Sequence, residues 1–200
     1  MGRRSDHGRD ELEALILDAG QQLMAEVGYS RFSAREVAKR IGYSVGTIMN
    51  VFGNVDGLVM AINGRTFALW AEWLEKRLSG VAGAERIKSL VQGYFDFAEA
   101  NRNLWAAIYE HRVPEDMEMR DLLVSERVGL TGIISREVEA ILPQEARCDA
   151  VRLARSLIAT VHGHCSFALG GSFALMGEAD PLGLAQDRVA ETLRAHGASI

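Results

Sequence analysis

Two short segments, residues 34–41 and 45–52, are joined only by the turn sequence Gly42-Tyr43-Ser44. Each segment spaces its apolar residues as a helix does, but each is shorter than the roughly 12 residues below which an isolated helix is marginal in water. Both helices must therefore be stabilised by packing against the rest of the chain. Two packed helices joined by so tight a turn are typical of a helix-turn-helix, whose second helix fits the major groove of DNA.

The residues before this pair predict another helix, from Arg9 to Val27. Its apolar positions recur at intervals of three and four and form one stripe: Leu12, Leu15, Ile16, Ala19, Leu23 and Val27. Gly28 is a typical helix stop. Ser33 precedes the next helix and Glu36 follows three residues later, which is the signature of a capping box. The three segments together predict a three-helix unit.

The last short helix has a predicted N-cap at Ser44, and Ile48, Val51 and Phe52 are expected to pack inward. The residues then left facing outward are Ser44, Val45, Gly46, Thr47, Met49 and Asn50. The whole chain has a net charge of −5, whereas residues 29–53 contain four basic residues and one acidic residue, a local charge of +3. This distribution argues against a general nucleic-acid coat protein but indicates a local basic patch.

Longer helical patterns fill the rest of the chain. They cover about residues 56–79, 84–101, 104–112, 115–142, 144–169 and 180–196. The chain has 48% hydrophobic residues, three prolines and almost no strand-like alternation, so the sequence predicts an all-α protein of about nine helices. We expect two domains, a helix-turn-helix domain in residues 1–54 and a larger helical bundle in residues 55–200.

The run from Ser33 to Leu58 resembles the TetR family of bacterial transcriptional repressors. The matching residues are Ser33, Arg35, Val37, Ala38, Gly42, Ser44, Gly46, Thr47, Phe52, Asn54 and Leu58, and the similarity covers roughly residues 9–62. The segment Val161-His162-Gly163 resembles the His-Gly motif of one C-terminal subfamily. The resemblance implies a homodimer that binds a palindromic operator in double-stranded DNA, represses transcription, and is released by a small-molecule effector bound in the second domain.

The resemblance also assigns DNA contacts by position. The implied DNA-binding residues are Ser33, Arg35, Ser44, Val45, Gly46, Thr47, Met49 and Asn50. Most relatives carry Lys at the positions of Val45 and Val55, and Tyr at those of Met49 and Val51. Fewer phosphate contacts predict weaker binding with a flatter salt dependence. Arg3, Arg4 and Arg9 are expected to compensate by reaching into the minor groove.

Two late helical patterns carry apolar stripes that are candidates for the dimer interface. Their residues are Leu153, Leu157, Val161, Leu182, Val189 and Leu193. Packed against the same stripes of a second copy, they would form a four-helix bundle. The alternative is that both stripes belong to the core of a single chain.

The second domain is rich in large aromatic and sulfur-containing side chains, which suit the wall of an effector pocket. The candidates are Trp70, Trp73, Phe95, Phe97, Trp105, Tyr109, Met117, His162 and Phe167. Such walls predict a mostly apolar or amphipathic effector. The alternative is that these side chains form ordinary core, as residues of this kind usually do.

Catalytic and metal chemistry find little support in the sequence. No nucleophile elbow, phosphate loop or zinc-binding helix motif appears, so we expect neither an enzyme nor a cofactor. His162 and His164 point about 200° apart on a helix and cannot share a metal ion, and His162 with Cys165 leaves a site short of ligands. No metal site is therefore expected.

Cysteine content and hydropathy indicate the setting. Two cysteines do not make a disulfide framework, and neither an N-terminal apolar run nor a membrane-spanning run is present, so we expect a cytoplasmic protein with no membrane partner. The remaining alternative to a DNA-binding regulator is a helical ligand-binding or protein-interaction module with weak or no specific DNA binding.

Overall fold

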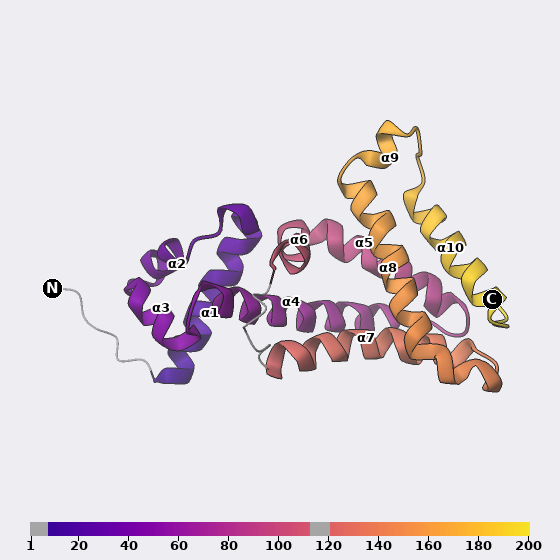
Figure 1. Cartoon of the computed structure of the whole chain (residues 1–200), viewed down its shortest axis with the longest axis horizontal. Coiled ribbons are helices and arrows are strands. Elements are labelled where there is room, and N and C mark those ends of the chain that lie inside the picture. The colour runs from indigo at the N-terminus through magenta and orange to yellow at the C-terminus, as the bar shows by residue number, and fades with distance from the viewer. Residues whose placement is uncertain (1–7, 113–120) are drawn as a thin grey trace. The chain divides into compact units, whose positions relative to one another are not determined.

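The chain is described by a computed structural model that covers residues 8–112 and 121–200, with side chains described for all of these except 121–126. The helices are α1 (Arg9–Val27), the 3-10 turn η1 (Tyr29–Arg31), α2 (Ala34–Ile41), α3 (Val45–Phe52), α4 (Val55–Leu78), α5 (Glu85–Ala100), α6 (Arg102–Glu110), α7 (Asp121–Ile141), the 3-10 turn η2 (Gln144–Asp149), α8 (Ala150–Leu169), α9 (Ser172–Leu175) and α10 (Pro181–Ala195). Figure 1 shows their order along the chain.

The all-α prediction is confirmed, since the described residues form helices and contain no strand. Two details differ from the prediction of about nine helices. The pattern at residues 144–169 begins as the 3-10 turn η2 before the α-helix starts at Ala150. The four-residue helix α9 was not predicted, because so short a segment carries no readable periodicity.

The chain divides into two compact units. The first unit contains Met1–Phe67 and Asn101–Glu126, and the second contains Ala68–Ala100 and Arg127–Ile200. This division differs from the predicted boundary after residue 54, because α6 packs against α1 and η1 and so joins the N-terminal helices. Helix α4 passes through Phe67 and contributes its two halves to different units.

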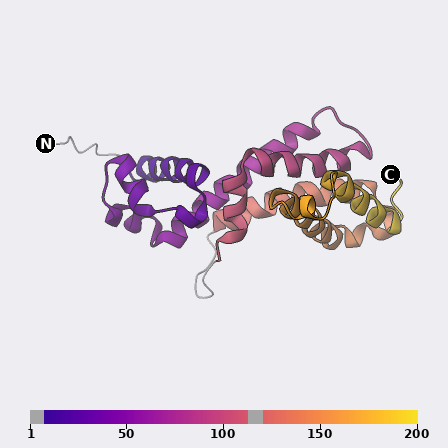
Figure 2. The same cartoon turned by 90° about the horizontal axis from the view of Figure 1, so that it is seen from above.

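In the first unit, α1 packs against α2, α3 and α6 around one apolar core. Ile16, Met24 and Val37 are completely buried there. The indigo helices in Figure 2, residues 9–52, are grouped around this core. The two short helices α2 and α3 are thus stabilised by packing against α1, as their length requires.

The turn between α2 and α3 has the predicted local chemistry. Gly42 ends α2 in the left-handed region, with φ of 74°, which costs a glycine little. Ser44 caps α3, since its Oγ accepts a hydrogen bond from the backbone N–H of Thr47 at 3.2 Å. The predicted capping box at Ser33 is wrong: Ser33 is the N-cap residue of α2, but its side chain makes no capping hydrogen bond.

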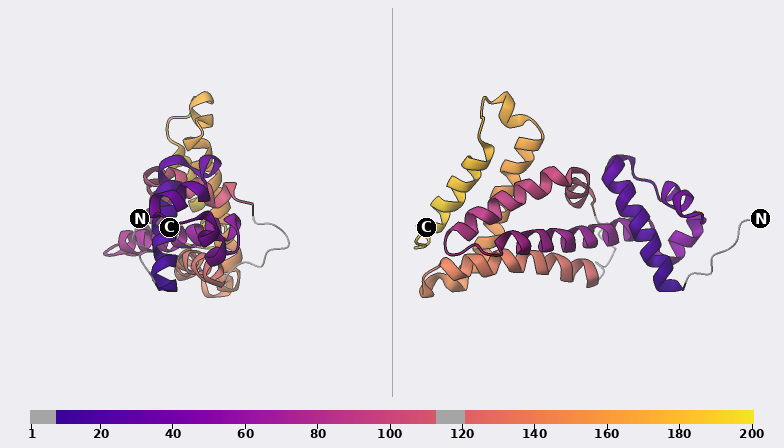
Figure 3. Two further views of the ribbon diagram at one scale, coloured as in Figure 1. Left: turned by 90° about the vertical axis from the view of Figure 1, so that its left-hand side faces the viewer. Right: turned by 180° about the vertical axis from the view of Figure 1, so that it is seen from behind.

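In the second unit, α8 and α10 lie side by side and α5 packs against both. Figure 3 shows these two helices from behind, joined at one end through α9. Arg86 at the start of α5 binds the buried carboxylate of Glu137 on α7 and also donates to the carbonyl oxygens of Leu78 and Val81. The N-terminus of α10 forms as predicted, since the Asp180 carboxylate accepts from the N–H of Gly183 and Pro181 stands in the first turn.

Membrane-spanning character is weak in the described helices. Taken singly, none of the described helices is both long and apolar enough to cross a membrane. Helices α3 and α4 reach that length and composition only when they are counted together, and they are bent by 67° relative to each other.

Candidate functional site

Helix α3 has one buried side and one open side. Ile48 is 0% exposed and Phe52 is 2% exposed, and both belong to the core of the first unit. Asn50 and Gly46 lie on the exposed side, and Thr47 between them is half-buried. The exposed surface of α3 therefore consists of a glycine, a hydroxyl residue and an amide.

The apolar residues of α3 that flank this surface are partly buried. Val45 and Met49, which the sequence predicts to face outward, are half-buried and pack against the core of the first unit. Val51, which was predicted to pack inward, is likewise only partly buried. The reason is that α3 packs against both α1 and α2. The buried face of α3 is therefore wide enough to include residues on either side of Ile48 and Phe52.

The other candidate DNA-binding residues lie at the starts of the two helices. Ser33 and Arg35 are exposed at the N-terminus of α2, and Ser44 is exposed at that of α3. The Oγ of Ser44 also lies 3.1 Å from Oγ1 of Thr47, so the Thr47 hydroxyl takes part in the cap of α3. Arg3 and Arg4 lie outside the described residues, and Arg9 is exposed at the start of α1.

The cations of the basic patch differ in how far they are already neutralised. Arg40 binds both carboxylate oxygens of Glu26 at 3.1 and 2.6 Å, and this hydrogen bonding lowers the pKa of Glu26. Nζ of Lys39 lies 3.8 Å from Oε2 of Glu36. Arg35 has no ion-pair or hydrogen-bond partner among the residues that the structure describes, so it is the cation most available to a phosphate.

Immediately after α3, the start of α4 is held by close backbone contacts. The Asn54 side-chain oxygen accepts a hydrogen bond from the N–H of Gly57 at 2.7 Å. A Cβ atom at position 57 would lie 2.1 Å from the carbonyl oxygen of Phe52, the last residue of α3, so only glycine fits there. The end of the candidate recognition helix is thus tied to α4.

The candidate effector residues do not form one group. Trp105 and Tyr109 belong to the first unit, whereas Trp70, Trp73, Phe95, Phe97, His162 and Phe167 belong to the second. Trp73, Tyr109 and Phe167 are exposed, and Met117 lies outside the described residues. Trp105 is buried, and Phe95 is half-buried.

Within the second unit, an aromatic cluster surrounds the Trp70 side chain, which is 1% exposed. The ring of Trp70 stacks on Phe97 at 4.8 Å between centroids and meets Tyr94 edge-on at 4.7 Å. The Tyr94 hydroxyl lies 3.0 Å from Nδ1 of His162, and burial lowers the pKa of His162. The indole N–H of Trp70 is buried without a hydrogen-bond acceptor among the described residues.

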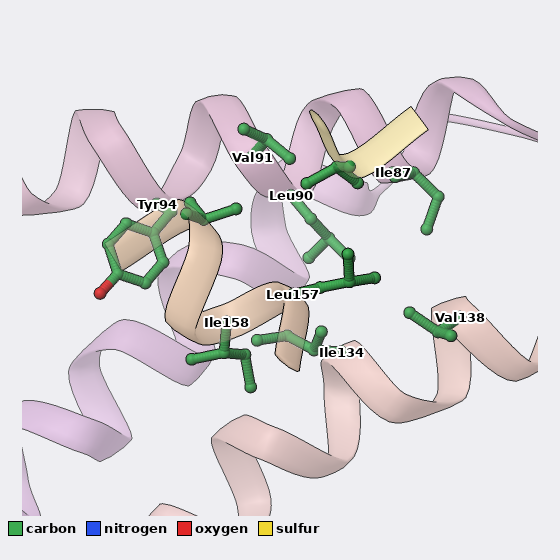
Figure 4. Close-up of a pocket in the computed structure, with 10 residues that line it drawn as sticks. Ile87, Leu90, Val91, Tyr94, Ile134, Val138, Leu157 and Ile158 are labelled. Carbon is green, nitrogen blue, oxygen red and sulfur yellow. The ribbon is translucent and has the colours of Figure 1, made fainter. Parts of the chain in front are cut away.

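Tyr94 also lines an apolar cavity between α5, α7, α8 and α10. Its walls are Ile87, Leu90, Val91, Tyr94, Ile134, Val138, Leu157, Ile158, Val161 and Val189, and its free volume is about 40 Å³. Figure 4 shows these side chains converging, with the Tyr94 hydroxyl at one end. None of the predicted effector residues that the structure describes lines this cavity. The aliphatic residues that do line it carry no signal that separates them from ordinary core.

The predicted dimer stripes lie in the interior of one chain. Leu153, Leu157, Val161, Val189 and Leu193 are buried within the single chain, where α8 packs against α10, and Leu182 is half-buried. This placement fits the alternative that the stripes are intramolecular core. The large apolar side chains left exposed in this region are Val151, Phe167, Leu175 and Met176.

The histidines and cysteines considered as metal ligands do not form a site in the described part of the chain. Among the described residues, no three His, Cys, Asp or Glu side chains are grouped closely enough to hold a metal ion. Cys165 is buried and Cys148 is exposed, and neither forms a disulfide bond.

Two family matches cover both units of the chain. Residues 16–62 match the family described as "Bacterial regulatory proteins, tetR family", and residues 87–192 match "Tetracyclin repressor-like, C-terminal domain". The HTH-type transcriptional regulator BetI of Serratia proteamaculans is 27% identical over 188 residues, which cover 90% of this chain and 92% of that protein.

Solved structures with the same fold cover nearly the whole chain. A protein of unknown function from Rhodococcus sp. RHA1 has a TM-score of 0.73 at 22% identity, and the match covers 100% of both chains. The regulator FadR from Bacillus subtilis, in complex with stearoyl-CoA, has a TM-score of 0.64 at 20% identity and covers 90% of this chain and 96% of that one. At these identities the likeness establishes a common fold.

Proposed function

Because the chain belongs to the TetR family of bacterial transcriptional regulators, it is a DNA-binding regulator, and we propose that it is a repressor released by a mostly apolar effector. The observation that carries the proposal is the arrangement of α3, which buries Ile48 and Phe52 and exposes Gly46 and Asn50. The major groove of DNA is wide enough for one α-helix such as α3, and Arg35 on α2 supplies a positive charge that is not neutralised by another described residue.

A gel shift at low salt tests the DNA-binding part. The double variant Arg35→Ala/Asn50→Ala should bind operator DNA at least about tenfold more weakly than the wild type, since it loses one phosphate and one base contact. The control is Gln22→Ala/Lys88→Ala, which removes an exposed amide and an exposed cation from α1 and α5. Equal affinity of all three proteins would favour the alternative, a helical interaction module without specific DNA binding.

The effector is proposed to enter the cavity beside Tyr94. A free volume of about 40 Å³ holds little more than one water molecule, so binding requires the walls to move apart. The walls are aliphatic apart from Tyr94, which favours a hydrocarbon chain. The ring of Trp70 packs edge-on against Tyr94, and its N–H has no acceptor among the described residues, which favours an oxygen acceptor at the Tyr94 end of that chain.

Thermal unfolding with long-chain alcohols, fatty acids and their CoA thioesters tests this proposal. FadR, a structural relative, was solved with stearoyl-CoA, so acyl compounds are the first choice. A ligand present at 100 times its Kd should stabilise the folded state by about 2.7 kcal/mol. Leu157→Trp, which fills the cavity, should abolish the stabilisation and leave operator binding intact, whereas stabilisation that survives this change would place the effector elsewhere.

The protein is proposed to act as a homodimer, since one α3 reads few base pairs and two read a palindrome. Phe167 is exposed near the end of α8, and Leu175 and Met176 are exposed in and beside α9, so we assign the dimer contact to these residues. Phe167→Glu should shift the sedimentation coefficient to that of a monomer and weaken operator binding, whereas Glu139→Gln should not. Because its target is chromosomal DNA, we place the protein in the cytoplasm, with binding rather than catalysis as its activity.

A further inference from the structure

The recognition helix α3 contains no ionisable side chain. Its sequence from Val45 to Phe52 is VGTIMNVF, and its N-cap is Ser44. Proteins read guanine in the major groove chiefly through Arg or Lys, and cytosine through Glu or Asp. Helix α3 therefore lacks the side chains that usually select a G·C base pair.

The residue best placed to read a base is Asn50. It follows the fully buried Ile48 by two residues, which turns it about 200° around the helix, to the side opposite the core. Asn50 is exposed and makes no hydrogen bond to any residue that the structure describes. A free side-chain amide places an NH2 donor group beside a carbonyl acceptor, so it can donate to N7 and accept from the N6 amino group of adenine.

The positions around Asn50 offer methyl groups and close approach rather than charge. The Thr47 hydroxyl is engaged with Ser44, which leaves its methyl group for contact with a base. Met49 is half-buried on one flank of the exposed face. At Gly46 a Cβ atom would have one neighbour within 4 Å among the described residues, the Ser44 Oγ at 3.6 Å, so the open backbone lets α3 approach a base edge closely. Apolar groups in the major groove contact the C5-methyl group of thymine.

We propose that α3 selects A·T base pairs, with Asn50 bonded to adenine and the Thr47 and Met49 side chains against thymine methyl groups. The inference rests on the proposed DNA binding and adds its base specificity. Arg35 does not alter it, because the first helix of a helix-turn-helix crosses the DNA backbone and its cation neutralises a phosphate.

The test is selection of the full-length protein on a library of random-sequence DNA duplexes at low salt, followed by sequencing. The enriched half-sites should share an A·T base pair at one position. Changing this pair to G·C should lower the affinity of the protein for the duplex by about tenfold or more. In Asn50→Ala this discrimination should fall to about twofold, and Asn50→Arg should shift the preference to guanine. Gln22→Ala, which removes an exposed amide from α1, should select the same sites as the wild type.

A second measurement isolates the methyl contacts. Selected duplexes in which deoxyuridine replaces thymidine lack the C5-methyl group and should bind several-fold more weakly, and Thr47→Ser should remove much of that difference. Enrichment of G·C-centred half-sites, or discrimination unchanged in Asn50→Ala, would overturn the inference while leaving DNA binding in place. Absence of any enriched sequence, with no affinity for the library at low salt, would overturn the proposed function as well.

Discussion

Nε2 of His111, whose side chain is 1% exposed, lies 3.0 Å from Oδ1 of Asp56. His111 follows the last residue of α6, and Asp56 stands in the first turn of α4. The imidazole also faces the ring of Tyr29 in η1 at 5.7 Å between centroids. Three elements of the first unit thus meet at the buried side chain of His111, and its partner Asp56 lies close in sequence to the end of the recognition helix.

We expect His111→Ala to destabilise the first unit by about 2 kcal/mol, because it leaves a cavity and removes the partner of Asp56. The measurement is chemical unfolding at neutral pH, with operator affinity as a second readout. His196→Ala, which changes an exposed histidine after α10, serves as the control and should have little effect. Equal stability of the two variants would contradict a structural role for the His111–Asp56 contact.

Gly57→Ala should destabilise the protein by about 1–3 kcal/mol and weaken operator binding. The added Cβ would lie 2.1 Å from the Phe52 carbonyl oxygen, so the end of α3 and the start of α4 must move apart. Gly129→Ala is the matched control, since a Cβ there has no neighbour within 4 Å among the described residues. In that helix position alanine should stabilise by up to about 1 kcal/mol, so the two substitutions should shift the melting temperature in opposite directions.

Glu137→Gln should cost about 3 kcal/mol, since it leaves Arg86 and Arg136 without their shared carboxylate. Hydrogen bonding to Arg86 lowers the pKa of Glu137 below 4.5. The unfolded chain therefore binds the proton more readily, and the stabilisation is present above about pH 4.5 and declines as the pH falls toward the folded-state pKa. The acid-unfolding curve of Glu137→Gln should lack this component, while that of the exposed Glu139→Gln should follow the wild type.

His162 should affect stability in a higher pH range. Burial lowers its pKa from 6.5, so the folded state favours the neutral imidazole. Stability is then full above about pH 6.5 and declines as the pH falls toward the folded-state pKa, because the unfolded chain takes up the proton first. The unfolding free energy, measured from pH 8 to about pH 5, should fall less in His162→Gln than in the wild type. A difference of the opposite sign would show that protonation is tolerated beside Tyr94.

Arg35 and Arg40 should differ in their effect on salt dependence. Arg35→Ala should lower the slope of log affinity against log salt by about 0.9, the value for one phosphate contact. Arg40→Ala should lower it less, because Glu26 already binds that guanidinium. Fluorescence anisotropy on one operator duplex across a salt series gives both slopes. Equal slopes would mean that the Glu26 ion pair opens when DNA binds.

Local features of the first unit could be predicted because they depend on neighbours in the chain. The spacing of apolar residues predicted α1, and Gly42 and Ser44 predicted the turn before α3. The cap at Ser33 was wrong even so, since the residue occupies the N-cap position without forming the side-chain bond. Periodicity also placed Ile48 and Phe52 in the core, but it did not show that Val45 and Met49 touch that core as well.

Contacts between distant segments could not be predicted, because residue spacing shows which face of a helix is apolar but not what covers that face. The stripes of α8 and α10 were predicted to pack against a second copy, with the core of one chain as the alternative, and the fold pairs them within one chain. Likewise, His111 and Asp56 are 55 residues apart, and the cavity beside Tyr94 needs side chains from four helices. The sequence alone determined the longer helices, the caps at Ser44 and Asp180, and the helix-turn-helix. The tertiary structure decided which apolar faces were buried and which stayed open, because burial depends on how the helices pack.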